Sequence, residues 1–500
     1  MPAARRAGTV WSSPGWRLFL TVWLVYSAFV TTNVVRETYL AITLGTHMSV
    51  RVDEYHDLHP DLFEFPGRGW YINSNPGASI LGAVPYAMFV RPAIALATKL
   101  KPSIVEPKPP ATYDDPRPNR TRFMNRARER GLDIVLGLAA LGTGVTLMAP
   151  LGALTAVLMF AWLRARLDER RALALSLLFA FATPALFRAA FINQNAVVAT
   201  LVLGAWVLKT GIQPRSASEP PGWKPLAGIG LLLGYALVCD YSAIPFLVVF
   251  GCWILFDAWR RGGAATAVRE GAVYTGAAFA AISVLFAYQW AAFGNPIWPA
   301  QRYMPPTEFS VRGWFGFTVP TVQLLVGNLF DPRYGLFAFS PLLLLAVAAP
   351  FLKSRSSRSP TRPELGWIAA CFVALLLFSS ANQFGNLQWN TGVRYMVPVA
   401  PLLFLAAVPV LSAVPRFARW AIIAVTVIIS LSVSMTREAV PIALRMLFTD
   451  GPTLPTLLVL QRTSSGYGVS LPGVAFWLIA IALSIVMVLI WRPYLKRAAS

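Results

Sequence analysis

The segment SVRVDEYHDLHPDLFEF, residues 49–65, gathers five acidic side chains in a chain of 500 residues that has only 22. Two of them, Asp53 and Glu54, are adjacent. A carboxylate at a water–lipid boundary can act as a general base, because partial burial raises its pKa toward neutrality. The sequence therefore offers this pair as a catalytic base, with a solvated acidic loop as the alternative.

The same segment places imidazole groups beside carboxylates, a composition that suits a metal ion. His56, His59 and Asp57 could hold zinc or manganese, since both metals accept nitrogen and oxygen ligands. Their spacing matches no established metal motif. A divalent metal ion is therefore an alternative cofactor, and the sequence indicates no other.

Hydrogen-bonding side chains continue after the acidic segment, in GRGWYINSNPGASILGAVPYA, residues 67–87. A helix start with an interfacial aromatic residue explains Pro76 and Tyr71, but it does not explain the amides that lie between them. A second group of polar residues lies in QWNTGVRYMVP, residues 388–398. The candidates for substrate binding are Tyr71, Asn73, Asn75, Trp389 and Asn390.

Arginines at the outer ends of apolar runs depart from the usual enrichment of basic residues in cytoplasmic loops. Arg394 lies between two such runs. A residue of this kind usually meets a specific anion, and a guanidinium offers two parallel hydrogen bonds to a phosphate. A salt bridge to a loop carboxylate is the alternative. Arg394, Arg302 and Arg333 are therefore candidates for binding a phosphate group.

A membrane-embedded scaffold must position these residues. Hydrophobic residues make up 56% of the chain and charged residues 13%, which is about half the charged share of a soluble domain. Apolar runs of about 20 residues, long enough to cross a bilayer as a helix, recur along the chain. The sequence predicts an all-α polytopic membrane protein with about 12–14 transmembrane helices. It also predicts outer-face loops and a juxtamembrane helix, because Leu40, Leu44 and Met48 form one helical stripe.

Clusters of Lys and Arg alternate with the apolar runs and orient the predicted helices. The long apolar runs 131–163 and 226–259 are each predicted to cross twice, because both of their flanks are basic. We expect a single membrane domain over residues 1–500, with both termini cytoplasmic in a bacterial inner membrane. The predicted outer-face loops are 36–76, 294–335 and 437–473, and the predicted cytoplasmic basic loop is 99–131.

The net charge of +21 does not indicate a nucleic-acid partner, because the basic residues lie in short clusters between apolar runs. The sequence has no phosphate-binding loop, no dinucleotide fingerprint and no nucleophile elbow. These observations argue against the use of ATP or nicotinamide. Membrane lipids are expected partners, and nucleic acid is not.

Several motifs together resemble those of the C-type glycosyltransferases. These are polytopic membrane enzymes that include protein O-mannosyltransferases, aminoarabinose transferases and their bacterial relatives. The motifs are the acidic pair soon after the first span, NSNPGASILGAVPY, DPRYGLFAFSPLLLLA and WNTGVRYMVPVAPLLFL, and the resemblance covers residues 16–415.

The resemblance implies transfer of a hexose or pentose from a polyprenyl-phosphate-linked donor. The acceptor would be a hydroxyl of a lipid, glycan or protein on the outer, periplasmic face, and the anomeric centre would invert. Asp53 would be the general base, with Glu54 as its neighbour or substitute. Arg394 would stabilise the leaving phosphate.

Two other classes of protein fit a chain with this many spans. One is a membrane transporter or lipid flippase of the cell envelope, and the other is a non-catalytic scaffold. Transporters usually carry charged or broken-helix sites near the bilayer midplane, often in two similar halves. The sequence shows no clear internal repeat, and its polar residues gather at the outer boundary.

Overall fold

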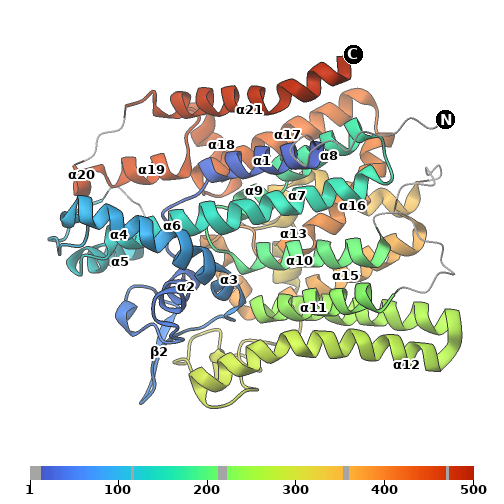
Figure 1. The fold of residues 1–500 in the computed structure, drawn as a ribbon, viewed down its shortest axis with the longest axis horizontal. Coiled ribbons are helices and arrows are strands. Elements are labelled where there is room, and N and C mark those ends of the chain that lie inside the picture. Colours follow the sequence, from blue (N-terminus) through green and yellow to red (C-terminus); the bar gives the residue numbers. More distant parts are fainter. Residues whose placement is uncertain (1–12, 114–117, 212–221, 353–359, 469–471, 500) are drawn as a thin grey trace.

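The computed structural model describes residues 13–113, 118–211, 222–352, 360–468 and 472–499. Figure 1 shows long helices running side by side, with many of the short helices and a β-hairpin at one end. Within the described residues, six helices are long and apolar enough to cross a membrane. The chain is therefore a polytopic α-helical membrane protein, as the sequence predicts.

The long helices form the transmembrane bundle. One of them, α12, changes direction at Gly262 and Gly263, where the backbone angles are not helical, and so contains two adjacent crossings. The helices of the bundle are α1 (Pro14–Ala28), α6 (Asp133–Thr143), η5 (Gly144–Met148), α7 (Ala149–Arg164), α8 (Glu169–Ala182), α10 (Gln194–Thr210), α11 (Trp223–Cys239), α12 (Ile244–Phe293), η8 (Pro341–Phe351), α15 (Arg362–Ala381), α16 (Ala400–Ala413), α17 (Arg416–Thr436) and α21 (Ala475–Ala499).

The start of α1 and the end of α21 lie side by side at one end of the bundle (Figure 1). Trp491 Nε1 donates a hydrogen bond to Thr21 Oγ1 at 2.9 Å, and Tyr494 lies 3.3 Å from Glu169 at the start of α8. We call this end the termini face. The opposite end carries residues 36–76, and we call it the loop face.

Short elements cover the loop face. They are α2 (Arg36–His47), η2 (Asp53–Tyr55), β1 (Leu62–Phe65), β2 (Gly69–Ile72), α3 (Gly77–Pro85), the π-helical turn η3 (Tyr86–Val90), α4 (Arg91–Leu100), η4 (Pro102–Ile104), α5 (Pro118–Glu129), α9 (Pro184–Arg188), η6 (Tyr241–Ala243), η7 (Ala300–Arg302), α13 (Val322–Phe330), α14 (Leu336–Phe339), η9 (Gln383–Asn390), η10 (Val397–Val399), α18 (Val440–Thr449), α19 (Pro455–Arg462) and α20 (Ser464–Tyr467). The predicted juxtamembrane helix over residues 36–48 corresponds to α2.

Strands β1 and β2 form an antiparallel hairpin whose register pairs Leu62 with Ile72 and Phe65 with Gly69. Its turn uses Gly67 at a φ of 76°, a conformation that glycine adopts without steric cost. Tyr71 of the hairpin packs against Phe293 at the end of α12, with ring centroids 5.2 Å apart. The hairpin is thereby fixed to the bundle.

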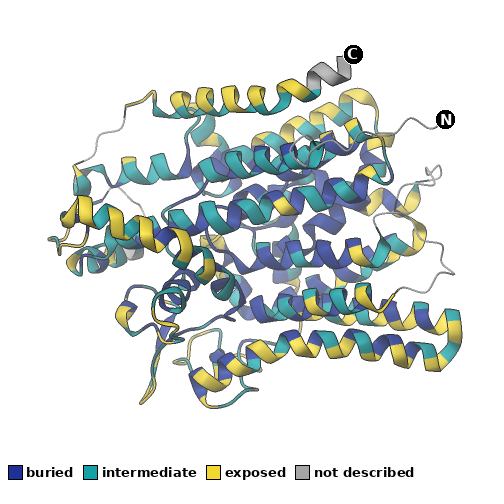
Figure 2. Ribbon diagram, viewed as in Figure 1, coloured by how far each residue is buried: buried dark blue, intermediate teal, exposed yellow. Residues whose placement is uncertain are grey.

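Burial follows the pattern of a protein surrounded by lipid. Figure 2 shows buried residues along the centre of the bundle and many exposed ones on α12, α21 and α4. Helix α16 is buried along most of its length. Trp290 on α12 and Val488 on α21 are 66% and 63% exposed although both are apolar. Such side chains suit contact with lipid tails.

The apolar run 131–163 crosses the membrane once, so the prediction of two crossings is wrong. Elements α6, η5 and α7 join into one helix of 32 residues, Asp133–Arg164, with Pro150 at its π-helical bend. Proline is tolerated there, because a bend already interrupts the regular hydrogen bonds. The run 226–259 does form two helices, which turn at η6 as predicted.

The described residues 99–113 and 118–131 lie at the loop face, whereas the sequence predicts a cytoplasmic loop on the opposite side from residues 36–76. Arg130 Nη1 donates to the carbonyl oxygen of His56 at 2.8 Å, and Arg126 Nη1 to that of Asp57 at 3.1 Å. The helix Gly77–Leu100 is long enough to span a membrane, but both of its ends are therefore at one face. Its exposed Leu96 and Leu100 suit a helix that lies along the membrane interface.

These two corrections lower the expected number of crossings. The sequence predicts at most 14 spans by the bilayer-length rule, about 12–14 in all. Removing one crossing from residues 131–163 and the crossing at residues 77–98 leaves about 12. An even number agrees with the placement of α1 and α21 side by side at the termini face.

Candidate functional site

Charged and amide side chains from distant parts of the chain meet around Tyr395 at the loop face. Burial raises the pKa of the Tyr395 phenol, while nearby positive charges lower it and nearby carboxylates raise it. We call this group the Tyr395 cluster. Its members are Arg36, Asp61, Asn73, Asn195, Asp240, Arg394 and Tyr395.

Helix and strand ends deliver these side chains. Arg36 is the first residue of α2, and Asn195 is the second residue of α10. Asp240 is the C-cap of α11, and its Oδ1 accepts a hydrogen bond from the Ser242 amide at 2.8 Å. Because the ends of many helices meet at one face of a bundle, residues far apart in the sequence converge there.

Arg36 is the centre of the acidic half of the cluster, and its side chain is only 12% exposed. Its Nε contacts Glu37 Oε1 at 2.9 Å, and its Nη1 contacts Asp61 Oδ2 at 2.9 Å and Asn73 Oδ1 at 2.7 Å. Asn73 Nδ2 in turn donates to Asp61 Oδ1 at 3.2 Å. A charge this buried is stable only when it is paired, so these contacts tie α2 to the hairpin.

Asp61 and His59 are both deprotonated near neutral pH, so Asp61 is charged and His59 is neutral. Burial acts to raise the pKa of Asp61, but Arg36, His59 and Arg394 outweigh it and hold that pKa at about 2. Burial lowers the pKa of His59, whose Nδ1 accepts a hydrogen bond from the Asp61 amide at 3.1 Å. A carboxylate with so low a pKa is a poor proton acceptor near neutral pH. Asp61 is therefore a positioning residue.

Arginines form the other half of the site. Arg394 Nε donates to Asn195 Oδ1 at 3.3 Å. Arg188 is 1% exposed, and its Nη1 donates to the carbonyl oxygen of Thr391 at 3.2 Å. The Arg437 guanidinium lies 3.8 Å from the ring centroid of Phe187 and donates to the carbonyl oxygen of that residue. The charges of Arg394 and Arg437 both act on Arg188, so the three guanidinium groups are neighbours.

Positive charge is concentrated in this half of the site, because the guanidinium groups of Arg394 and Arg437 lie close enough to act on that of Arg188. In the part of the chain that the structure describes, Arg188 Nε is buried without a hydrogen-bond partner. Like charges at this depth repel strongly, and an anion with several oxygens would pair with them. The arrangement suits a phosphate group.

The predicted acidic pair lies in η2, beside the hairpin. Asp53 Oδ1 accepts a hydrogen bond from the Trp70 amide at 2.7 Å, and its Oδ2 lies 2.5 Å from Arg51 Nη2. Its side chain is 41% exposed. Trp70 is three residues before Asn73, a separation of about 10 Å at the usual rise of a strand. The structure therefore does not bring Asp53 into the Tyr395 cluster.

Glu54 lies outside the Tyr395 cluster, and the candidate metal ligands lie apart from one another. Glu54 is exposed and lies beside Tyr55. His56 Nε2 lies 3.1 Å from Arg130 Nη2, and Asp57 is exposed, whereas His59 turns toward Asp61. Within the described segments, no group of three or more His, Cys, Asp or Glu side chains could hold a metal ion. A metal at His56, His59 and Asp57 thus gains no geometric support.

Of the five candidates for substrate binding, Asn73 alone belongs to the Tyr395 cluster. Tyr71 is 2% exposed and donates to the carbonyl oxygen of Arg68 at 3.1 Å, and Asn75 Nδ2 donates to that of Leu237 at 2.8 Å. These contacts give Tyr71 and Asn75 structural roles. Trp389 and Asn390 are exposed on η9.

The three candidate phosphate-binding arginines have different surroundings. Arg394 belongs to the cluster. Arg333 forms two hydrogen bonds with Asp331, from Nε at 3.0 Å and from Nη2 at 2.7 Å. The guanidinium of the exposed Arg302 lies 4.4 Å from the ring centroid of Trp298. The structure therefore singles out Arg394 among the three.

Sequence reasoning missed Arg36, Arg188 and Arg437 as site residues. All three stand at the end of an apolar run on the side predicted to be outside, the same anomaly that identified Arg394. A systematic search for outer-side arginines would have found them. Nothing in the sequence shows that they face one another, because their separation is fixed by helix packing.

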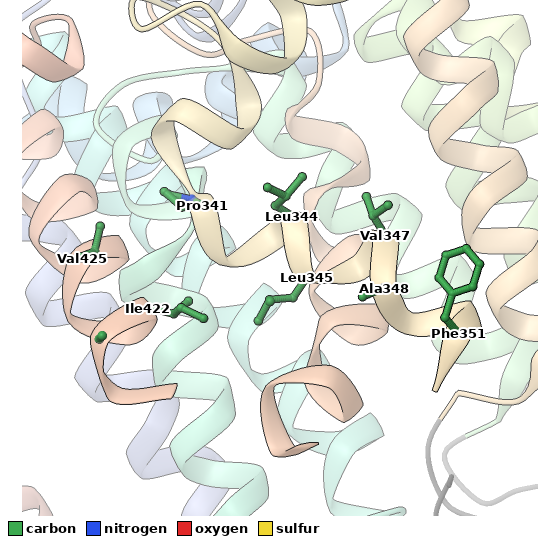
Figure 3. Close-up of a pocket in the computed structure, with 9 residues that line it drawn as sticks. Pro341, Leu344, Leu345, Val347, Ala348, Phe351, Ile422 and Val425 are labelled. Carbon is green, nitrogen blue, oxygen red and sulfur yellow. The ribbon is translucent and has the colours of Figure 1, made fainter. Parts of the chain in front are cut away.

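An apolar groove lies apart from these charged residues, and none of its lining residues is charged. It has a volume of about 640 Å³ and lies between η8 and α17. Figure 3 shows that its lining is apolar. The lining residues are Pro341, Leu344, Leu345, Val347, Ala348, Phe351, Ala421, Ile422 and Val425. A groove of this composition at the surface of a membrane helix suits a lipid tail and offers no group for catalysis.

Comparisons with known proteins find a similar solved structure. No protein-family model matches the chain, and no curated protein matches it. The crystal structure of ArnT from Cupriavidus metallidurans bound to undecaprenyl phosphate matches with 16% identity and a TM-score of 0.46. ArnT is a C-type aminoarabinose transferase. The match covers 83% of this chain and 62% of the ArnT chain, so it spans less than two thirds of ArnT.

Proposed function

We propose that this protein transfers a sugar from a polyprenyl-phosphate-linked donor to an acceptor hydroxyl at the loop face, with inversion of the anomeric carbon. The observation that carries the proposal is the cluster of guanidinium groups around Arg188 and Tyr395, at the ends of membrane helices. A phosphate carried on a lipid can bind these guanidinium groups while its polyprenyl tail stays between the membrane helices.

Arg394, Arg188 and Arg437 would hold the donor phosphate. Guanidinium groups bind phosphate through paired hydrogen bonds, and these three are oriented by contacts with Asn195 and with the backbone carbonyls of Thr391 and Phe187. Their positions are thus set before the donor arrives. Fixed positive charge of this kind stabilises a leaving phosphate without reorganisation during the reaction.

Asp53 would be the general base, with Glu54 as its neighbour or substitute. Inversion requires the acceptor oxygen to attack from the face of the sugar opposite the phosphate. The base must therefore lie one sugar ring away from the phosphate site, and catalytic groups on opposite faces of a sugar are typically about 6.5–9.5 Å apart. Asp53 accepts a hydrogen bond from the Trp70 amide, about 10 Å along strand β2 from Asn73 of the Tyr395 cluster, and this placement agrees with a base that is separate from the phosphate site.

The proposed reaction exchanges one bond at the anomeric carbon for another. The acceptor oxygen forms a bond to that carbon while its proton passes to Asp53. The bond from carbon to the phosphate oxygen breaks, and polyprenyl phosphate leaves with its charge facing Arg394. The transferred sugar would be a hexose or a pentose, and the acceptor hydroxyl would belong to a lipid, a glycan or a protein.

The loop face would be the outer face of a bacterial inner membrane. Nucleotide sugars are cytoplasmic, so a transferase on the outer face needs a donor carried by a lipid. Arg164, Arg170 and Arg171 follow the helix α7 at the termini face, which fits a cytoplasmic surface. A transporter or flippase fits less well, because transporters usually place their charged groups near the midplane.

Transfer of labelled sugar from a synthetic polyprenyl-phosphate donor by the purified protein tests the proposal. We expect Asp53→Asn to lower the transfer rate by about 10²–10⁴, the usual contribution of a general base. Glu54→Gln shows whether the neighbour substitutes for Asp53, and Glu64→Gln on the same hairpin is the matched control. Transfer at the wild-type rate by folded Asp53→Asn and Glu54→Gln variants would overturn the assignment of the base.

A further inference from the structure

Four polar side chains beside the Tyr395 cluster are almost completely buried, yet each has an atom without a hydrogen-bond partner among the described residues. The atoms are Gln194 Oε1, Asn195 Nδ2, Ser242 Oγ and Gln289 Oε1. The exposed fractions of these residues are 4%, 0%, 3% and 2%. Buried polar atoms in proteins are nearly always paired, so four unpaired atoms in one place call for an explanation.

These residues stand on elements that contact one another. Gln194 and Asn195 begin α10, Ser242 lies in η6, and Gln289 lies near the end of α12. Helices α10 and α12 both contact η6. We call the four residues the polar floor. It forms one surface, although its members are up to about 95 positions apart in the sequence.

Hydrogen bonds connect the polar floor to the proposed phosphate site. Gln194 Nε2 donates to Asp240 Oδ2 at 2.5 Å, and Asn195 Oδ1 accepts from Arg394 Nε at 3.3 Å. Gln289 Nε2 contacts the Tyr241 hydroxyl at 3.1 Å. Asp240 and Tyr241 are partly exposed, so they lie between the polar floor and the surface. A molecule held at Arg394 would have the polar floor within reach.

The unpaired atoms indicate which kind of ligand could form hydrogen bonds with them. The two glutamine oxygens accept hydrogen bonds, the Asn195 amide donates, and the Ser242 hydroxyl does either. None of the four is charged. Sugar hydroxyls both donate and accept hydrogen bonds, so a polyhydroxyl ring would pair with all four unpaired atoms. A cation would pair only with the acceptors, and a carboxylate would pair only with the donors.

We propose that the polar floor binds the hydroxyl groups of the donor sugar and selects an uncharged sugar. This inference rests on the proposed function, because the sugar would be delivered by a phosphate bound at Arg394. An amino sugar fits less well, since its ammonium group would lie near the Arg394 guanidinium.

Binding to the purified full-length protein in detergent tests the inference. The probes are polyprenyl phosphodiesters of equal charge at phosphorus that carry a methyl group, glucose, mannose, galactose, arabinose or 4-amino-4-deoxyarabinose. We expect at least one neutral sugar to bind about tenfold or more tightly than the methyl ester, since several hydrogen bonds are gained. It should also bind more tightly than the amino sugar.

The possible results separate this inference from the proposed function. Binding of the methyl ester and of every sugar ester with equal affinity would overturn the role of the polar floor and leave the phosphate site standing. Tighter binding of the amino sugar than of any neutral sugar would do the same. Absence of binding by every probe would overturn both.

Ser242→Ala and Gln289→Met distinguish sugar binding from a purely structural role. Removing a buried polar atom that has no partner is neutral or stabilising for the fold. We therefore expect Ser242→Ala to leave the melting temperature unchanged or higher while reducing the affinity for the neutral sugar ester about three- to tenfold. The affinity for the methyl ester should stay at the wild-type value.

Ser176→Ala is the matched control, because the Ser176 hydroxyl is buried in α8 and already donates to the carbonyl oxygen of Ala172 at 2.7 Å. It should leave both affinities unchanged. Equal losses for the sugar ester and the methyl ester in Ser242→Ala and Gln289→Met would show that these residues act on the phosphate site or the fold, and would overturn the inference.

Discussion

At the scale of single residues, the buried charges of the acidic half tie the stability of the loop face to pH. Asp61 has a pKa of about 2, below its ordinary value of 3.8, so its stabilising contribution is present above pH 4 and is lost only as the pH falls toward 2. His59 has a pKa lowered by burial, so its neutral form is favoured in the folded protein. Its contribution is complete above pH 6.5 and is lost as the pH falls below that value.

We predict that the protein loses thermal stability between pH 7.5 and 5.5, with His59 as one cause. One proton contributes at most about 1.4 kcal/mol per pH unit to this slope. Melting curves of His59→Gln should show a shallower decline, even if its stability at pH 7.5 is lower. The exposed His56 serves as control, and His56→Gln should keep the wild-type slope. Equal slopes in all three proteins would contradict the buried, neutral state of His59.

At the scale of elements, the hairpin β1–β2 connects the two proposed functions of the site. One part of it carries Asp61 and Asn73, which contact Arg36, and another part positions Asp53 through the Trp70 amide. Gly69 lies between them at a φ of 113°. A Cβ atom there would lie 2.5 Å from Asp53 Oδ1 and 2.6 Å from Arg51 Nε.

Gly69→Ala should therefore displace Asp53 and lower the transfer rate. We expect about a tenfold or larger loss, together with backbone strain of about 1–3 kcal/mol. Gly67→Ala in the same turn is the control, because it has a φ of 76° and open space around it, so it adds strain without touching Asp53. Transfer rates and melting temperatures of both variants make the comparison. Equal rates in the two variants would mean that the position of Asp53 does not matter.

The elements also show why some predictions succeed and others fail. The turn at residues 240–243 is predictable, because Asp240 interrupts a long apolar run and caps the next turn through Ser242. The single crossing at residues 131–163 is not predictable from the sequence, because the charge rule places the basic loop before it on the wrong side of the membrane. That side depends on contacts of Arg126 and Arg130 with backbone carbonyls, which no composition rule describes.

For the site residues, too, some features are predictable from the sequence and others depend on tertiary packing. Arg394 is identifiable as an arginine where the charge rule expects none, and Asp61 lies within the acidic segment that stands out in the sequence. Their meeting is not identifiable, since it depends on how α2, α10 and the segment after η9 pack together. The sequence thus indicates the chemistry available, and tertiary packing decides which groups share a site.

At the scale of the whole molecule, the orientation of residues 99–131 separates the structure from the sequence-based topology. Cysteines introduced singly at His47, Lys101 and Arg164, with the exposed Cys252 replaced by serine, would react with a membrane-impermeant maleimide according to side. We predict that His47→Cys and Lys101→Cys label in intact spheroplasts and that Arg164→Cys labels only after permeabilisation. Labelling of Lys101→Cys together with Arg164→Cys would instead support a crossing by residues 77–100.

The central claim is that the proposed phosphate-binding site lies at one membrane boundary of the bundle. Binding of polyprenyl phosphate to the purified protein tests it most directly, with Arg394→Ala compared with wild type. Arg333→Ala is the matched control, because Arg333 is an exposed arginine of the loop face that pairs with Asp331. We predict that Arg394→Ala weakens binding by about 10-fold or more while Arg333→Ala binds as the wild type does. Equal affinity in Arg394→Ala and wild type would contradict the claim.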